Sequence, residues 1–192
     1  MALDATGEAS DEALLVLYGN GDASAARELT SRLAPVAYRV AVRMLADRAE
    51  AEDVTQEALL RLWRIAGQWR QNEARVSTWL YRVTANLCTD RLRRRRGVAI
   101  DEIPEPADGQ PAVAERMIAA DRAAALEAAL SLLPDRQRQA VVLRHLEGLS
   151  NPEIAQIMEI GVEAVESLTA RGKRALAQAL SGRREELGYD HD

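Results

Sequence analysis

The sequence predicts an all-α fold built as two small helical domains. Ala, Leu, Arg and Glu are abundant among the 192 residues, whereas Phe is absent and only 6 Pro occur, and this composition favours helix over sheet. Apolar residues recur at helical spacing, as at Val54, Ala58, Leu62 and Ile65. One acidic, Pro-rich stretch lacks such a period and divides the chain into two helical parts.

The first predicted domain covers residues 10–97. Caps and turns mark the starts of its helices, which are expected at Asp11 behind the cap Ser10, at Asp22, at Pro35 in a first turn, at Ala51, and behind Ser77 or Thr78. Gly-containing turns are expected to end the first, the fourth and the last of these helices, near residues 19–21, 67 and 97.

Residues 98–114 form the predicted linker. This segment includes Pro104, Pro106 and Pro111 together with a cluster of acidic residues, so it can bury little apolar surface. We therefore expect an acidic, flexible linker between the two domains.

The second predicted domain covers residues 115–181 and contains a helix-turn-helix. Two helices are expected over about 116–132 and 135–147, followed by a third whose start carries the capping-box pair Ser150 and Glu153. The turn Glu159-Ile160-Gly161 then leads to a long last helix from Val162 to about residue 180. Two helices joined by a short turn that contains Gly are typical of DNA-binding helix-turn-helix domains.

Charge is segregated along the chain, although the net charge is −5. Residues 61–97 hold ten Arg and two acidic residues, and Trp63, Trp69, Trp79 and Tyr81 lie in the same block. Arg contacts phosphates, and aromatic rings hold bases that have left the stack, so this block indicates binding to a strand of DNA that is being melted. For Trp63 and Trp79 core packing is the favoured alternative, and the role of Tyr81 stays undecided.

Catalytic and metal-binding patterns are absent from the sequence. Cys88, His145 and His191 have no metal-ligand spacing, and no phosphate-binding loop or nucleophile motif occurs. We therefore expect no metal, no cofactor and no enzyme activity, with Cys88 in the core. No apolar run is long enough to cross a bilayer, and the acidic N-terminus differs from a secretory signal, so a cytoplasmic protein without direct membrane insertion is expected.

Three motifs occur in a fixed order around the linker. They are AEAEDVTQEALLRLW, then STWLYRVTANLCTDRLRR, then LPDRQRQAVVLRHLEGLSNPEIAQIM with the long helix that follows it. With these motifs the chain resembles the extracytoplasmic-function sigma factors of bacterial RNA polymerase, in the sigma-70 superfamily, over roughly residues 11–180. The resemblance implies a protein that binds core RNA polymerase and promoter DNA and directs transcription initiation. It also implies a stress response and an anti-sigma factor that holds the protein inactive.

The first motif implies a surface that docks on polymerase. In similar proteins the matching helix face binds the coiled coil of the largest polymerase subunit, and the candidates here are Asp53, Gln56, Glu57 and Leu60. Leu60 falls among polar residues, as an exposed anchor at a protein interface does. An ordinary solvated helix face is the alternative.

The second motif matches the part of the family that recognises and melts the −10 element, which makes the first domain sigma domain 2. By resemblance Arg82 and Asn86 touch this element, and residues 70–78 match a loop that holds a flipped base. The run Arg93, Arg94, Arg95 and Arg96 is expected to contact phosphates, although a basic helix end also complements the helix dipole. The linker matches a segment in the RNA exit path, with a plain tether as the alternative.

The last helix matches the one that recognises the −35 element, which makes the second domain sigma domain 4. Its outward stripe is expected to be Glu163, Glu166, Ser167, Ala170, Arg171 and Arg174, and the DNA-binding candidates are Glu166, Ser167, Arg171, Lys173 and Arg174. Many relatives carry Lys and Arg at the positions of Glu166 and Leu168. Glu166 either accepts a hydrogen bond from a cytosine amino group or only complements the helix dipole.

Two other classes of function fit parts of the sequence. A stand-alone helix-turn-helix regulator that binds duplex operators accounts for the second domain, but not for the Arg- and Trp-rich first domain or the face around Asp53. A nucleic-acid-remodelling enzyme needs a nucleotide-binding loop, which the sequence lacks.

Overall fold

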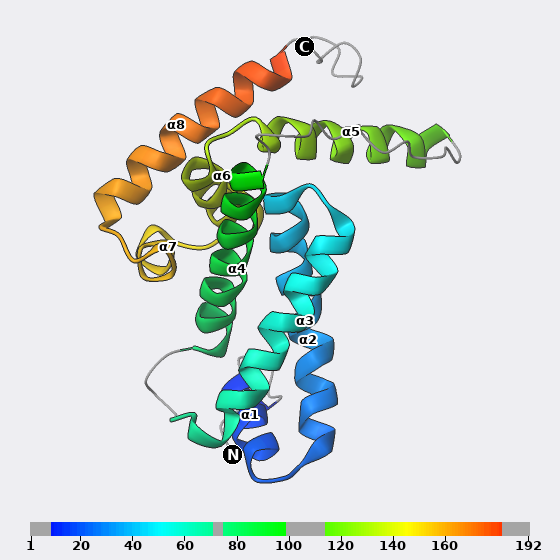
Figure 1. Cartoon of the computed structure of the whole chain (residues 1–192), viewed down its shortest axis with the longest axis vertical. Helices are drawn as coiled ribbons and strands as arrows, with labels where there is room; N and C mark the ends of the chain where they lie inside the picture. The colour runs from blue at the N-terminus through cyan, green and yellow to red at the C-terminus, as the bar shows by residue number, and fades with distance from the viewer. Residues whose placement is uncertain (1–8, 71–74, 99–113, 182–192) are drawn as a thin grey trace.

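The computed structural model describes residues 9–70, 75–98 and 114–181, and helices account for nearly all of them (Figure 1). The first part of the chain comprises α1 (Asp11–Gly19), α2 (Ala23–Leu45), α3 (Arg48–Ile65), the 3-10 turn η1 (Ala66–Gln68) and α4 (Val76–Val98). The second part comprises α5 (Ala114–Ser131), α6 (Asp135–Val141), the π-helical segment η2 (Val142–Leu146), α7 (Asn151–Met158) and α8 (Val162–Ser181). The predicted all-α fold is confirmed.

The first part is a bundle in which α2 and α3 lie against α4, and α1 packs across one end (Figure 1). Large apolar side chains fill this end of the bundle, among them Leu29, Leu62 and Leu80. The predicted N-cap of α1 is confirmed, since the Ser10 hydroxyl accepts a hydrogen bond from the backbone N–H of Ala13 at 3.2 Å. Asp22 caps α2 in the same way.

Pro35 does not start a new helix, and that prediction is wrong. It lies inside α2, which runs unbroken for 23 residues. Proline in a helix interior removes one hydrogen bond and costs about 3 kcal/mol. The buried stripe of α2 continues on both sides of it, from Leu33 to Ala37 and Val40. Burial of this stripe outweighs the local cost, because tertiary packing supplies most of the stability of a helix.

The start of α4 also differs from the expectation. Ser77 and Thr78 lie inside the helix and do not cap it. The backbone N–H of Val76 instead donates to Glu12 Oε1 of α1 at 2.9 Å. A carboxylate from a distant helix therefore satisfies the first turn, which no local sequence signal indicates. Residues 71–74 of the predicted loop lie outside the described residues.

The second part contains the predicted helix-turn-helix, formed by α7, a short turn and α8. The capping box is confirmed, with Ser150 and Glu153 bonded reciprocally at the start of α7. Glu159 ends α7 in the left-handed region at φ 53°. The helix expected over 135–147 is regular only to Val141, beyond which η2 continues it.

The two parts are packed together rather than held apart. In Figure 1, α7 lies beside α4, while α5 and α8 lie near its C-terminal end. One hydrophobic cluster joins Val40 and Met44 of α2 and Cys88 of α4 to Leu143 and Ile154 of the second part. The linker predicted over 98–114 falls almost entirely outside the described residues, so its flexibility stays an expectation.

Membrane-spanning and metal-binding features were sought among the described residues. None of the helices described is both long and apolar enough to cross a bilayer. Within the same residues, His, Cys, Asp and Glu side chains form no group of three or more that could hold a metal ion.

Candidate functional site

The four predicted docking residues lie on the outer face of α3. Asp53 and Gln56 are exposed, and Leu60 is 49% exposed, which is unusual for a large apolar side chain. The opposite face of α3 is buried through Val54, among other residues. The face therefore presents an exposed leucine framed by acid and amide groups.

Two ion pairs hold the acids of this face in place. Glu57 Oε1 accepts a hydrogen bond from Arg61 Nε at 2.8 Å, and this bond lowers the pKa of the Glu57 carboxyl. Asp53 Oδ2 lies 3.7 Å from Arg91 Nη1 of α4. Pairs this exposed contribute little to stability, so both acids remain available to a partner.

The predicted −10 contacts lie on α4. Asn86 is exposed, whereas Arg82 is partly covered and its Nη1 lies 3.6 Å from Glu159 Oε1 at the end of α7. One of the two residues therefore lies near the second part of the chain.

The four consecutive arginines of α4 have different surroundings. Arg94 is exposed, and Arg93 pairs with Asp90 one turn before it. Arg95 turns inward, where it pairs with Asp47 and Glu50 and donates to the carbonyl of Leu45. Arg96 pairs with Asp135 of α6. Arg93 and Arg94 are thus the members of the run that face solvent without a partner from elsewhere in the described fold.

The role of Tyr81, which the sequence left undecided, is defined by its contacts. The ring is 9% exposed, and its hydroxyl donates to Glu147 Oε2 at 3.2 Å. Burial, assisted by the Glu147 carboxylate, raises the pKa of Tyr81 to about 12. Arg39 and Arg43 of α2 donate to the same carboxylate at 3.2 Å and 2.5 Å.

Arg138 of α6 is a second feature that the sequence analysis missed. Its side chain is buried and donates to four backbone carbonyls, those of Leu130, Ser131, Leu133 and Met44. Burial lowers the pKa of the guanidinium. Helical spacing gives the one signal for this position, because Arg138 shares a face with the buried Val141 and Val142.

The candidate recognition residues of α8 face solvent. Glu166 is exposed and accepts a hydrogen bond from Asn151 Nδ2 at 3.3 Å. Arg171 donates to the hydroxyl of Ser167 at 2.6 Å, and Lys173 and Arg174 are exposed. Leu168 is partly buried against the shared cluster, so it belongs to the core side of the helix.

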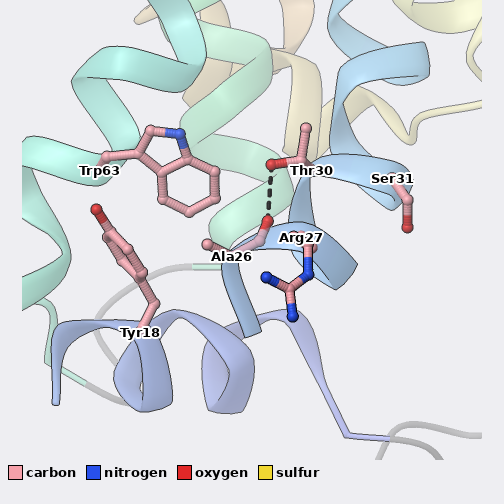
Figure 2. A pocket seen from close by; sticks show the side chains of 6 residues that line it. All are labelled: Tyr18, Ala26, Arg27, Thr30, Ser31 and Trp63. Atoms are coloured by element: carbon pink, nitrogen blue, oxygen red, sulfur yellow. Dashed lines mark hydrogen bonds between the residues drawn. The ribbon is translucent and has the colours of Figure 1, made fainter. Parts of the chain in front are cut away.

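Trp63 and Trp79 have the packing role that was favoured for them, since both pack against the core of the first part. Figure 2 shows the Trp63 ring of α3 above Tyr18 of α1, and the ring centroids lie 4.9 Å apart. They line an open hollow with four residues of α2, namely Ala26, Arg27, Thr30 and Ser31. Trp79 packs edge-on against Trp69. None of the predicted docking or DNA-binding residues lines this hollow.

Comparisons with known proteins identify both parts of the chain. Sigma-70 region 2 matches residues 29–98, and Sigma-70 region 4 matches residues 123–176. The chain is 34% identical to the ECF RNA polymerase sigma factor SigM of Mycobacterium tuberculosis, over 90% of this chain and 86% of that protein. It is 31% identical to SigW of Bacillus subtilis, over 83% of this chain and 91% of that protein. It is 35% identical to SigE of Mycolicibacterium smegmatis, but spans 61% of that longer protein.

Solved structures with the same fold include two proteins in complexes, CnrH and the sigma factor RpoE. CnrH, solved with the cytosolic domain of CnrY, gives a TM-score of 0.67 at 23% identity and covers 90% of this chain and 97% of its own. RpoE of Bartonella quintana, solved with the anti-sigma factor NepR, gives a TM-score of 0.65 at 20% identity. The match covers 81% of this chain and 96% of RpoE. From the two family matches and the relatives of comparable length, the chain belongs to the extracytoplasmic-function sigma factors, non-enzymatic proteins that bind core RNA polymerase and promoter DNA to initiate transcription.

Proposed function

We propose that the chain docks on core polymerase through Asp53, Gln56, Glu57 and Leu60 of α3. The observation that carries this proposal is Leu60, a large apolar side chain that is 49% exposed on a charged helix face. Interfaces place such apolar anchors inside a polar rim. The sigma domain 2 assigned to residues 10–97 ends with α4, and the sigma domain 4 assigned to 115–181 falls within α5 to α8.

The two domains divide the promoter between them. Arg82, Asn86, Arg93 and Arg94 on α4 act at the −10 element, while Ser167, Arg171, Lys173 and Arg174 on α8 act at the −35 element. The exposure of all four α8 residues supports this assignment. A stand-alone regulator would need only the helix-turn-helix, and the region 2 match over residues 29–98 leaves that alternative without support.

An anti-sigma factor is the regulator that we propose for the chain, acting in the cytoplasm during a stress response. Two proteins of the same fold were solved with partners, CnrH with the cytosolic domain of CnrY and RpoE with the anti-sigma factor NepR. The described helices also offer no membrane span that would place the chain elsewhere.

Comigration with core polymerase tests the docking surface directly. The wild-type chain is expected to elute with core polymerase in gel filtration, and Leu60→Ala is expected to weaken this complex about tenfold. Leu132→Ala is the matched control, because Leu132 is also an exposed leucine, at 75%, but lies in the second part. If Leu60→Ala and Leu132→Ala elute with core polymerase in equal amounts, the proposal for α3 is contradicted.

A further inference from the structure

Val162 is one of three large apolar side chains that are exposed among the described residues, together with Leu60 and Leu132. It is the first residue of α8, and it is 40% exposed. Its near neighbours Ile160 and Val165 pack against the apolar cluster that joins the two parts, whereas Val162 stays in contact with water. Burial of this side chain by a partner would therefore be favourable.

The surface of α8 places Val162 beside two carboxylates. Residues four apart are neighbours on a helix surface, so Val162 lies next to Glu166, and Glu163 follows it directly in the chain. Glu166 Oε1 accepts a hydrogen bond from Asn151 Nδ2 at 3.3 Å, and the first turns of α8 lie beside α7 (Figure 1). Val162 thus borders the outward stripe of the helix that is proposed to act at the −35 element.

The first nine residues of α8 contain no basic side chain. Residues 162–170 read VEAVESLTA, in which Glu163 and Glu166 are the charged groups, and the basic residues of the helix begin only at Arg171. Guanine is most often recognised by Arg or Lys, which donate to its O6 and N7 atoms. The first turns of α8 cannot recognise guanine in this way, and they offer carboxylate oxygens and an apolar side chain instead.

Electrostatics and groove geometry together select the DNA group that Val162 can contact. In helix-turn-helix domains the recognition helix enters the major groove with its N-terminal residues against the base edges. Carboxylates repel phosphates, so a valine beside Glu163 and Glu166 fits base edges better than it fits the DNA backbone. The apolar group that base edges offer in this groove is the C5-methyl group, which in unmodified DNA belongs to thymine.

We propose that Val162 is a specificity-determining residue of the −35 contact and that its side chain packs on the C5-methyl group of a thymine. This inference rests on the proposed role of α8 at the −35 element. The promoter carries an A·T pair where it faces the start of α8, while guanine or phosphate contacts fall further along, at Arg171 and Arg174. The methyl contact does not require Glu166 to recognise a base, so the two residues are tested separately.

Transcription from a promoter library randomised across the −35 region tests the base preference. Core polymerase with the wild-type chain is expected to enrich thymine at one position of this region. Val162→Ala should reduce that enrichment about fourfold, the factor for one buried methylene group, and leave the other positions unchanged. Leu132→Ala is the matched control, because it truncates another exposed apolar side chain that lies outside α8, and it should keep the wild-type preference.

Deoxyuridine in place of the enriched thymine tests the methyl contact itself, because it removes the C5-methyl group and keeps the base pair. With the wild-type chain this change is expected to weaken promoter binding by the polymerase complex about fourfold. With Val162→Ala it should have no further effect, since the partner of the methyl group is already lost. Val162→Ile keeps a β-branched apolar side chain and should remain sensitive to deoxyuridine.

Two results overturn the inference. The first is equal binding of thymine and deoxyuridine promoters by the wild-type chain at every −35 position. The second is a loss in Val162→Ala that is equal on all promoters and accompanied by weaker comigration with core polymerase, because Val162 would then contact protein.

Arg174→Gln separates these failures from failure of the proposed function. If it changes neither the affinity for the promoter nor the preference in the −35 region, the assignment of α8 to this element is refuted, and the inference falls with it. If Arg174→Gln weakens promoter binding while Val162→Ala keeps the wild-type base preference, only the inference about Val162 is refuted.

Discussion

Asp53 and Glu57 combine exposure with weak intramolecular pairing, and this combination makes them suitable for a charge-reversal experiment. Their replacement by Lys should reduce transcription about tenfold or more, because the partner surface would meet repulsive charge. Helicity and melting temperature should change little, since exposed pairs contribute little to folding. Transcription assays of the double variant measure the first effect, and circular dichroism measures its helicity and melting temperature.

Glu52→Lys is the control for this variant, as Glu52 is an exposed acid of the same helix outside the proposed docking set. A large loss of stability in the double variant would mean that the face is part of the fold, and the docking assignment would then fail.

Glu166 has two alternative roles that a single substitution distinguishes. If Glu166 reads a base, Glu166→Ala should weaken promoter binding by about 1 to 3 kcal/mol and relax the preference at one promoter position. As a dipole partner it should lower stability by a few tenths of a kcal/mol and leave DNA preference unchanged. Its bond to Asn151 lies on the solvent side and leaves the second carboxylate oxygen for DNA. Transcription from promoter variants, beside Arg171→Ala, measures the difference.

Tyr81 and Cys88 predict how alkaline pH affects folding. Burial raises the pKa of Cys88 from 9.0 to about 12 and that of Tyr81 from 10.0 to about 12. A raised pKa in the folded state contributes stability that is complete below the unfolded value and is lost as pH rises through the folded value. The free energy of unfolding should therefore fall between pH 9 and 12. In Tyr81→Phe the fall should be shallower above pH 10, as urea titrations at several pH values would reveal; an identical slope contradicts the burial of this hydroxyl.

At the scale of elements, the crossing of α6 and α8 depends on Gly172. A Cβ built there would lie 2.6 Å from Val141 Cγ2 and 3.1 Å from the carbonyl oxygen of Gln137. Gly172→Ala should therefore lower the free energy of unfolding by about 1 to 3 kcal/mol through overpacking. Gly161→Ala is the matched control, since a Cβ at Gly161 meets nothing within 4 Å. Equal chemical denaturation midpoints for the two variants would refute the close approach.

Several element boundaries were predicted well where the signal was local, although α3 starts at Arg48 behind the cap Asp47 and was expected to start at Ala51. Ser10, Asp22 and the pair Ser150 and Glu153 each cap the helix that the sequence assigned to them, because a cap acts within three residues. The errors at Pro35 and at the start of α4 have the opposite origin. A buried stripe carries α2 through its proline, and a carboxylate of α1 caps α4, so both depend on contacts that periodicity does not encode.

The same distinction applies to the candidate site. Exposure of Asp53, Leu60 and the α8 stripe followed from helical spacing, which separates the two faces of one helix. The Glu147 partner of Tyr81 and the Met44 partner of Arg138 did not follow, because each lies in the other part of the chain. Family resemblance aligns motifs along the sequence and carries no information on how the two parts pack in the free protein.

For the whole molecule, the linker is the expected site of first proteolysis. Residues 98–114 combine three Pro with several acids, and they join two parts that have helices of their own on either side. Limited digestion of the free chain, read by mass spectrometry, should cut there before any helix. A first cut within residues 75–96 would mean that α4 opens more readily than the linker, contrary to the domain boundaries proposed.

Arg138 determines what separation of the two parts would leave behind. Three of its four carbonyl partners belong to the second part itself, at the end of α5, and only Met44 lies in the first. On separation the guanidinium keeps its local bonds and exchanges a single carbonyl for water. The second part thus keeps three of the four hydrogen bonds of Arg138 without any contact to α2. A separation of the two parts would consequently not require the second part to refold.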